Sequence, residues 1–432
     1  MDQSTEAISN PDLYYLKSVT DLSESVEVVS SEDIYSQSGI KLVNKGTRLD
    51  KSFYERLIHH KLASSPIDRS LAAKNSVTPY SLALDAAKMI DDDAVLGRMA
   101  NALPDALLLR NALAQIVLNP PLAFKLTLAR EKHPELYQHS IRVALISLYL
   151  GASLHLKPAD MKDLATAAMF HDLGELHIDP ALLDRTRTLT EAERHYIYAH
   201  PMIAYLILKE YPEYHPHVST TVLNHHERLD GSGYPRNIKG DKINPLGQIL
   251  AVAEVAGSLC SREATDACAQ VEVILKLNPG QFRADLVRYL SAIARQGQAS
   301  AAPEKRTDPA TICVRLEQIA KTLADWKQAM LPYRGAQMAG YLSYADERVS
   351  NLEKSLFDVG YNSAGLHAII NGIEEDPASL SELEHLLHEI GWQLKYTVNE
   401  IRRRWPALAD THDPAAAALL ACVAQAERIL LT

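Results

Sequence analysis

The sequence predicts an all-α protein with a small β element. Apolar residues recur at helical spacing along most of the chain, and strand-like runs are too few to build a fold around a sheet. The chain has 432 residues, of which 47% are hydrophobic and 23% are charged, a composition typical of globular proteins. At roughly 150 residues per domain, this length corresponds to about three domains.

The first residues, 1–24, are polar, and we expect them to form a mobile tail. The region 25–133 that follows is predicted to be mostly helical with a short β element. Two β-branched runs, Val26–Val29 and Ile40–Val43, indicate a β hairpin, and Gly46 follows them as a turn.

Helical spacing then dominates the rest of this N-terminal region. The apolar residues of Leu49–Leu62 predict one helix, and the segment from Val77 to Leu128 predicts several. We expect interruptions at Pro104 and at the pair Pro120-Pro121, because proline removes a backbone donor and clashes with the preceding helical turn.

Three further regions complete the predicted organisation. Residues 134–297 are helical by pattern, apart from a glycine-rich interruption at Asp230–Pro235. Residues 298–310 are rich in alanine, proline and charge, which is typical of a linker. Residues 311–432 are predicted to form a helical C-terminal region, which contains all three tryptophans.

The overall composition excludes several classes of protein. With 44 basic and 54 acidic residues the net charge is −10, which argues against binding to a nucleic acid polymer. The four cysteines are scattered and form no C-x-x-C pair, so neither a disulfide framework nor a thiolate zinc site is expected. The apolar stretches fall short of the ~20 residues that cross a bilayer. The N-terminus lacks the order of a signal peptide. We therefore expect a cytoplasmic protein without a membrane span.

Histidine is unevenly distributed along the chain. Of the 17 histidines, 11 lie between residues 131 and 230. Candidate metal ligands follow one another there in order: Glu135 and His139, the pair His171-Asp172, His200, the pair His225-His226, and finally Glu254.

The spacing of these residues suits a site built from several helices. Glu135 and His139 are four residues apart, which places them on one helix face. The gaps from His139 to His171 and onward are 32, 29, 25 and 28 residues, and each leaves room for a helix out and a helix back. A structural role is the alternative for any isolated histidine, but the ordered set favours a shared site.

The candidate set exceeds the four ligands of a tetrahedral zinc ion, so two or three metal ions are expected. Imidazole and carboxylate ligands suit iron, manganese and zinc alike. Metal ions about 3.5–4 Å apart can hold a hydroxide and clamp the oxygens of a phosphoryl group during in-line displacement. The residues therefore predict a metal-dependent phosphohydrolase.

Three segments of the histidine-rich region resemble the HD-GYP family: HDLGELHIDPALL, LTEAERHYIYAHPMIAYLIL and NHHERLDGSGYP. The resemblance covers roughly residues 134–297. It implies a helical domain of the HD superfamily with two or three divalent metal ions, iron or manganese. It also implies hydrolysis of cyclic di-GMP to pGpG or GMP.

The resemblance further implies roles for individual residues, among which His171 and Asp172 would be catalytic. The metal ligands would be Glu135, His139, His171, Asp172, His200, His225, His226 and, where the family has Asp, Glu254. The presence of Glu135 favours the version with three metal ions. The substrate would contact Arg185, Asp230, Gly231, Gly233, Tyr234, Pro235 and Arg262.

The sequence departs from the family pattern where positive charge is usual. Glu175 stands in place of a lysine, and Glu263 and Asp266 stand where basic residues are common. Carboxylates repel an anionic phosphate. A second hypothesis is therefore a catalytically degenerate domain that keeps its metal ions and acts as a signalling adaptor through protein partners. A third is hydrolysis of another phosphoester that needs fewer cations.

The flanking regions indicate no ligand of their own. The segment His385–Trp405 is amphipathic, and we interpret its run Arg402–Arg404 as a solvated helix end rather than a binding patch. We hypothesise that residues 311–432 couple to the metal domain through homodimerisation or through a signalling protein.

Overall fold

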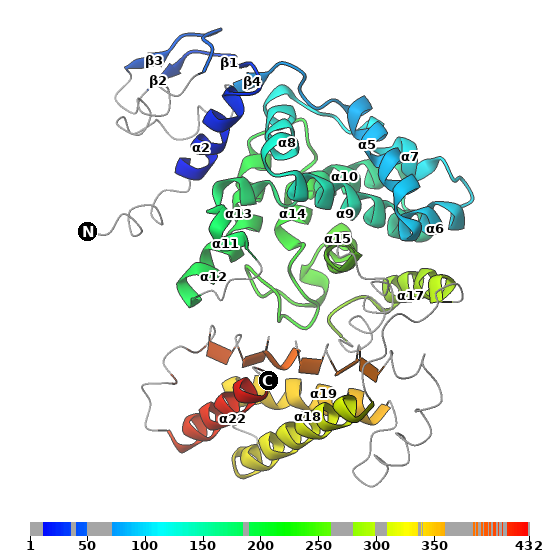
Figure 1. Cartoon of the computed structure of the whole chain (residues 1–432), viewed down its shortest axis with the longest axis vertical. Coiled ribbons are helices and arrows are strands. Elements are labelled where there is room, and N and C mark those ends of the chain that lie inside the picture. Colours follow the sequence, from blue (N-terminus) through cyan, green and yellow to red (C-terminus); the bar gives the residue numbers. More distant parts are fainter. Residues whose placement is uncertain are drawn as a thin grey trace. The chain divides into compact units, whose positions relative to one another are not determined.

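The computed structural model describes residues 12–35, 40–49, 71–184, 190–260, 280–298, 309–335, 338, 340–358, 383–408 with interruptions, and 413–430. The described residues are mostly helical, with two small antiparallel sheets, as the sequence predicts (Figure 1). The chain divides into two compact units. The first comprises residues 1–262 and 280–289, and the second comprises residues 263–279 and 290–432.

The first unit contains the strands and most of the short helices. In chain order its elements are α2 (Asp12–Ser23), β1 (Val28–Ser30), β2 (Ile34–Tyr35), β3 (Lys41–Val43), β4 (Leu71–Ala73), α5 (Pro79–Asp92), α6 (Ala94–Ala102), α7 (Leu108–Ala112), η1 (Leu113–Gln115), α8 (Pro120–Lys132), α9 (Pro134–Ser153), α10 (Pro158–Phe170), η2 (Leu173–His177), α11 (Pro180–Leu183), α12 (Glu191–Tyr198), α13 (His200–Lys209), α14 (Pro216–Asn224), η3 (Gly240–Lys242) and α15 (Pro245–Cys260). The η elements are 3-10 helices. The helix α17 (Ala284–Gln298) crosses the boundary between the two units.

Helix α9 is the centre of the first unit. Every residue from Val143 to Leu150 is buried, so this helix has no solvent-facing side over that length. A helix that is buried all round belongs to the interior of a domain. It packs against α10 and α15, which are themselves largely buried. Of the candidate ligands, His139 lies on α9, Glu254 lies on α15 and His171 directly follows α10.

Prolines set many of the helix starts. Pro120 is the first residue of α8, and Pro134, Pro158 and Pro216 begin α9, α10 and α14 in the same way. Proline fits the first helical turn because the N–H that it lacks would have no partner there. Pro104 lies in the break between α6 and α7, so both predicted interruptions are confirmed.

The first residues of the chain are not all a polar tail. Residues 12–23 form α2, which buries the side chains of Tyr15, Leu16, Val19 and Leu22. These apolar residues recur at helical spacing, so one face of the helix is excluded from water. The prediction of a tail over residues 1–24 is therefore wrong from Asp12 onward.

The predicted hairpin is also wrong, because its two runs take other partners. β1 pairs with β4, with Val28 opposite Ala73, and β2 pairs with β3, with Ile34 opposite Val43. The backbone of β1 also bonds to the segment Gly46–Leu49, through Ser30 N to Thr47 O at 3.0 Å and Leu49 N to Val28 O at 2.9 Å. Both edges of β1 are therefore occupied, which leaves Lys41–Val43 to pair elsewhere. The predicted helix Leu49–Leu62 lies outside the described residues after Leu49.

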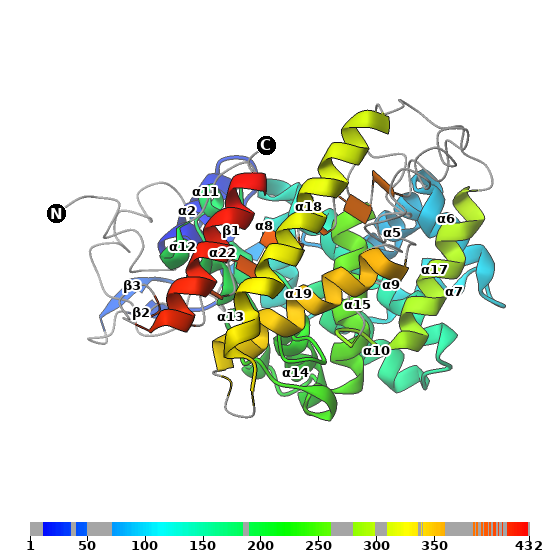
Figure 2. The ribbon, with the colours of Figure 1, turned by 90° about the horizontal axis from the view of Figure 1, so that it is seen from below.

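The second unit has a helical core of its own. Its described elements are α18 (Pro309–Met330), η4 (Leu331–Tyr333), α19 (Gly340–Asp358) and α22 (Pro414–Leu430), together with helical positions between residues 383 and 402. Helix α18 packs against both α19 and α22 (Figure 2). Trp326 is 1% exposed at the centre of this core. The predicted linker lies almost wholly outside the described residues.

Among the described helices of both units, we find none with the length and apolar character that a bilayer span requires.

Candidate metal centre

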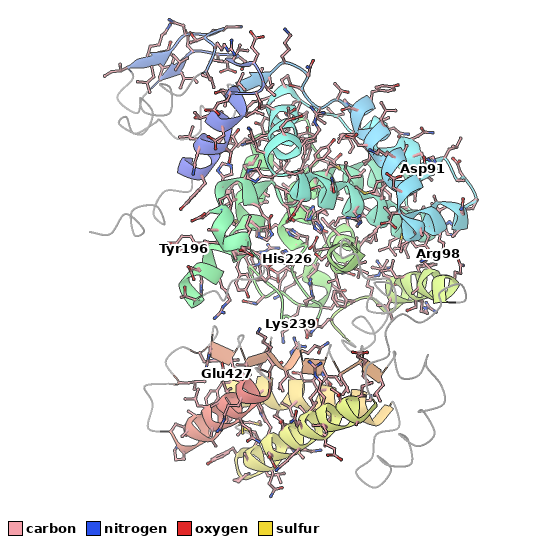
Figure 3. The ribbon with its side chains drawn as sticks, in the orientation of Figure 1. Asp91, Arg98, Tyr196, His226, Lys239 and Glu427 are labelled. Atoms are coloured by element: carbon pink, nitrogen blue, oxygen red, sulfur yellow. The ribbon has the colours of Figure 1, made fainter. Side chains whose placement is uncertain are left out.

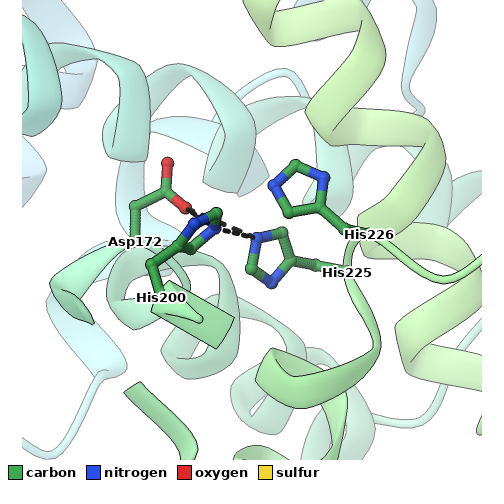
Figure 4. A group of neighbouring side chains, drawn as sticks. All are labelled: Asp172, His200, His225 and His226. Carbon is green, nitrogen blue, oxygen red and sulfur yellow. Dashed lines mark hydrogen bonds and ion pairs between the residues drawn. The ribbon is translucent and has the colours of Figure 1, made fainter. Parts of the chain in front are cut away.

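Seven of the predicted ligands come together inside the first unit, where they form two groups. One group consists of Asp172, His200, His225 and His226, and the other consists of His139, His171, Asp172 and Glu254. Within each group every residue offers one donor atom, and these atoms lie within 4.8 Å of one another. Figure 4 shows the side chains of the first group, and Figure 3 places His226 among the helices of the first unit.

Asp172 belongs to both groups. Its Oδ2 lies 3.1 Å from His171 Nε2 and its Oδ1 lies 3.2 Å from His200 Nε2. One carboxylate therefore faces the two groups with its two oxygens. A carboxylate in this position can bridge two metal ions, which is the arrangement of dinuclear hydrolytic sites.

Helix ends orient three of the imidazoles. His171 and His225 directly follow α10 and α14, and His200 begins α13. In each, Nδ1 lies against the carbonyl oxygen three residues earlier, at 2.7 Å for His171, 2.7 Å for His200 and 2.5 Å for His225. A carbonyl can only accept, so Nδ1 carries the proton and donates it to this bond. The other nitrogen, Nε2, is left facing the centre as an acceptor, as a metal-binding histidine requires.

The donor atoms fit a cation better than they fit one another. His200 Nε2 and His225 Nε2 are 3.1 Å apart, although each belongs to a ring whose proton is already placed on Nδ1. Two acceptor nitrogens at this distance repel unless a proton or a cation lies between them. Asp172 Oδ1 is buried next to both rings, yet it accepts no hydrogen bond of good geometry from the described residues. The residues present therefore fit a bound metal ion.

The second group closes around Glu254 of α15. Glu254 Oε2 lies 2.8 Å from His139 Nε2 and 3.1 Å from His171 Nε2, while its other oxygen accepts a bond from Ser258 at 2.8 Å. The longer arm of Glu, compared with the Asp that the family has here, reaches the two imidazoles. Gly257 of the same helix packs against Val143 and His139 of α9, so α15 approaches α9 closely at this level.

The electrostatics of the centre favour positive charge between the two carboxylates. Burial opposes ionisation of Asp172 and Glu254, but the neighbouring imidazoles outweigh it and hold the pKa of both well below its usual range. Burial likewise opposes protonation of His171, but Asp172 and Glu254 outweigh it and raise the pKa of His171. For His225, burial outweighs the opposing effect of Asp172 and lowers the pKa to about 4. A divalent cation at the carboxylates would take the place of these protons.

Glu175 faces both groups without belonging to either. It lies on η2, the 3-10 turn that directly follows Asp172, and it is half-buried. Burial, reinforced by the charge of Asp172, raises the pKa of Glu175 to about 7. The position at which the family has a lysine is therefore close enough to the centre to change its charge.

The glycine-rich loop after α14 covers the histidines of the first group. The ring of Tyr234 stacks on His226 with centroids 4.5 Å apart, and the ring centroid of Tyr198 in α12 lies 4.3 Å from that of Tyr234. Gly233 has no room for a side chain, because the backbone of His226 and Glu227 lies against it. Gly231 has a φ of +78°, which favours glycine.

A buried glutamate fixes this loop. Glu227 is 1% exposed, and its carboxylate accepts the backbone N–H groups of Arg236 at 2.8 Å and Ile238 at 3.1 Å. These two bonds hold the segment after Pro235 against Glu227, which directly follows His226 in the chain. The sequence prediction of the site left out Glu227 and Tyr198. In the sequence, the only indication of a role for either residue is that it lies within one of the segments that resemble the HD-GYP family.

The remaining candidates have different locations. Glu135 is exposed in the first turn of α9, outside both groups. Asp230 and Pro235 lie in the loop that carries Tyr234, and Asp230 accepts the backbone N–H of Ser232 at 2.8 Å. Arg185 and Arg262 lie outside the described residues. The same is true of Glu263 and Asp266.

Comparison with known proteins adds to this geometry. Residues 126–277 match the family model described as HD domain. Over 146 residues the chain is 32% identical to the 3'3'-cGAMP-specific phosphodiesterase 3 of Vibrio cholerae, which covers 34% of this chain and 32% of the relative. Over 169 residues it is 25% identical to the cyclic di-GMP phosphodiesterase PA4108 of Pseudomonas aeruginosa, which covers 39% of this chain and 41% of the relative. The match thus spans about a third to two fifths of the length of these curated relatives.

Among solved structures, the chain is similar to Bd1817, an HDG"Y"P protein from Bdellovibrio bacteriovorus. The identity is 14% and the TM-score is 0.35, over 62% of this chain and 94% of that protein.

The His-Asp centre and the family match define a protein that contains an HD domain. The segment HHERLDGSGYP, which begins directly after α14, resembles the HD-GYP family.

Proposed function

We propose that this chain is a metal-dependent phosphodiesterase that hydrolyses cyclic di-GMP to pGpG or GMP. The observation that carries the proposal is the pair of four-donor groups that share Asp172. The names of the curated relatives, which are cyclic di-GMP and 3'3'-cGAMP phosphodiesterases, support a cyclic dinucleotide as the substrate class. Since one relative is named for 3'3'-cGAMP, that dinucleotide is the second substrate to test.

We propose two divalent metal ions, iron or manganese, held by His139, His171, Asp172 and Glu254 on one side and by Asp172, His200, His225 and His226 on the other. When bound, such ions polarise the phosphate and lower the pKa of a water molecule so that it becomes a nucleophile. Glu135 lies outside both groups. A third ion would therefore require Glu135 to join His139 across one helical turn.

The protein's own residues supply orientation. The Nδ1 bonds of His171, His200 and His225 hold the three Nε2 atoms on the centre, so little reorganisation is needed when the substrate arrives. Asp172 carries the negative charge that keeps both groups attractive to cations. Tyr234 and the glycines beside it form one wall next to His226, where we place the substrate. We assign Arg185 and Arg262 to substrate phosphate by family resemblance alone.

The alternative proposal is a degenerate domain that keeps its metal ions and acts through protein partners. The observation that favours it is Glu175, a carboxyl group whose pKa is raised by burial together with the charge of the nearby Asp172. If Glu175 is ionised, an anionic phosphate at the centre loses a charge-assisted contact and gains a repulsion, at a cost on the order of 1.5–3 kcal/mol for the contact. The variant Glu175→Lys, which restores the lysine of the family pattern, tests this alternative, because a degenerate domain should gain turnover from the substitution.

The deciding experiment uses protein prepared without oxygen and loaded with iron or manganese. It is incubated with cyclic di-GMP, and the products are separated by chromatography beside the variant His171→Ala. The proposal predicts pGpG or GMP from the wild type and none from the variant. Full metal occupancy without product from the wild type would instead support the adaptor role or another phosphoester.

A further inference from the structure

The N-terminal helix α2 packs against the part of the chain that carries the metal ligands. It contacts α8 and the turn η2, with α2 and α8 side by side in Figure 1. Its buried face consists of Tyr15, Leu16, Val19 and Leu22. Helix α2 is thus part of the interior of the first unit rather than an appendage to it.

A stack of three side chains joins these elements. The ring of Tyr15 in α2 lies on the imidazole of His177 in η2, with centroids 4.7 Å apart and planes inclined by 10°. Above the same Tyr15 ring, the ammonium group of Lys125 in α8 lies 4.0 Å from the centroid. The exposed fractions are 2% for Tyr15, 5% for His177 and 0% for Lys125. A cation over an aromatic ring is attracted most strongly when both are removed from water, as they are here.

Two polar contacts fix α2 on either side of the stack. The Tyr14 hydroxyl donates to Asp179 Oδ2 at 3.0 Å, and Asp179 is the N-cap residue of α11, just after η2. The Ser18 hydroxyl lies 3.2 Å from His133 Nε2 at the start of α9, the helix that carries His139. Helix α2 therefore holds both η2 and the beginning of α9.

The turn η2 connects this stack to the candidate metal centre. It begins at Leu173, immediately after Asp172, and the Glu175 N–H donates to the Asp172 carbonyl at 2.9 Å. In the same turn, Gly174 leaves no room for a side chain because the backbone of His200 lies against it. The turn thus contacts Tyr15 through His177 and the backbone of a second candidate ligand through Gly174, so we expect a displacement at His177 to reach Asp172.

We propose that Tyr15 and His177 are positioning residues, through which α2 holds Asp172 in the geometry that binds metal. The inference rests on the metal centre of the proposed function. The side chain of neither residue belongs to the two donor groups, so each acts through the turn. The N-terminal helix would then control the metal affinity of the domain.

The test measures manganese binding to the metal-free full chain by titration calorimetry, with thermal unfolding followed in parallel. Tyr15→Leu removes the stack and should weaken manganese binding by roughly 10–100-fold, the range found when partners of metal ligands are lost. Tyr15→Phe keeps the ring and should bind within about threefold of the wild type. His177→Ala and His177→Phe repeat the comparison from the other side of the stack.

Val19→Ala is the matched control, because Val19 is 0% exposed on the same helix and takes no part in the stack. It should lower the unfolding temperature while leaving the manganese affinity unchanged. If Tyr15→Leu does not fold, the pair His177→Ala and His177→Phe decides alone. A wild type that binds manganese, with Tyr15→Leu and His177→Ala binding equally well, would overturn the inference and leave the proposed function standing. A wild type that binds neither manganese nor iron(II) would overturn both.

Discussion

At the scale of single residues, the centre depends on which nitrogen of each histidine faces inward. A free histidine can place its proton on either nitrogen, but the carbonyls of Ala168, Ile197 and Val222 decide the matter for His171, His200 and His225. The choice is made by the backbone at helix ends, which is rigid. The same three side chains on loops would need to be ordered when the metal binds, at a cost in affinity.

The raised pKa of Glu175 predicts that the stability of the fold depends on pH. Its pKa of about 7 in the folded chain lies above the 4.5 of a free glutamic acid, so the folded state binds this proton more tightly than the unfolded state. Its contribution to stability is therefore favourable at low pH and is lost as the pH rises from about 4.5 to about 7.

We expect Glu175→Gln to remove this dependence. In the presence of a chelator, the variant should gain about 1–3 kcal/mol relative to the wild type between pH 5 and pH 8, measured by urea unfolding. Glu135→Gln, at an exposed position, should show no such change and serves as the control. A constant difference between Glu175→Gln and the wild type across this range would show that Glu175 ionises normally.

The limits of sequence reasoning are clearest for individual ligands. The four-residue spacing placed Glu135 and His139 on one helix face, but one helical turn is also ~5.4 Å along the axis. This separation leaves Glu135 in solvent while His139 meets Glu254. The pair His171-Asp172 could be singled out as a ligand pair, but nothing local shows that Asp172 faces both groups, because that depends on where α13, α14 and α15 are packed.

At the scale of elements, the loop after α14 determines how the first group is covered. Tyr234 reaches His226 because Gly233 allows the chain to fold back directly against His226 and Glu227. Glu227 then secures the returning segment with two backbone hydrogen bonds. The sequence pattern predicted a close backbone approach from the glycines, but it did not show that the approach is to the protein's own backbone.

Gly233→Ala tests this element. A Cβ at Gly233 would overlap backbone atoms, which cannot move aside as a side-chain end can. We expect a loss of stability on the order of 2 kcal/mol or more and weaker metal binding through His226. The comparison is Gly97→Ala in α6, where a Cβ would make only an ordinary contact of 3.5 Å, so stability should be unchanged or slightly increased. Equal behaviour of the two variants in thermal unfolding would contradict this role for the loop.

Elements far apart in sequence were the least predictable. Helix α2 was expected to be a polar tail, because its buried residues are interspersed with Asp, Lys, Ser and Thr and its helix is short. Its place is decided by Lys125 and His177, neither of which shows from its own neighbours in sequence that it will stack with Tyr15. The helices of the centre were predictable because their apolar runs are long and their starts are marked by proline.

At the scale of the whole molecule, the chain divides into two compact units. All seven of the gathered candidate ligands lie in the first unit. The described core cluster of the second unit draws only on residues from Ile312 onward, including Trp326 and Leu419. A separate core is consistent with a role in association rather than in the chemistry of the centre.

Removal of residues 311–432 should therefore change the oligomeric mass measured by light scattering. Because the core cluster of the second unit contributes nothing to the two donor groups, we expect the shortened chain to keep its metal stoichiometry. An unchanged mass would exclude dimerisation through this region and leave a signalling partner as its proposed role. A loss of bound metal would show that the second unit supports the centre.

The whole scheme depends on Asp172 holding two metal ions at once. Anomalous X-ray scattering from crystals grown with manganese tests this directly, beside crystals of Asp172→Asn. We predict two anomalous peaks about 3.5–4 Å apart in the wild type, one near His139 and Glu254 and the other near His200 and His226, with Asp172 between them. In Asp172→Asn both peaks should weaken. A single peak in the wild type, or two peaks that persist at full height in Asp172→Asn, would contradict the shared carboxylate and with it the dinuclear centre.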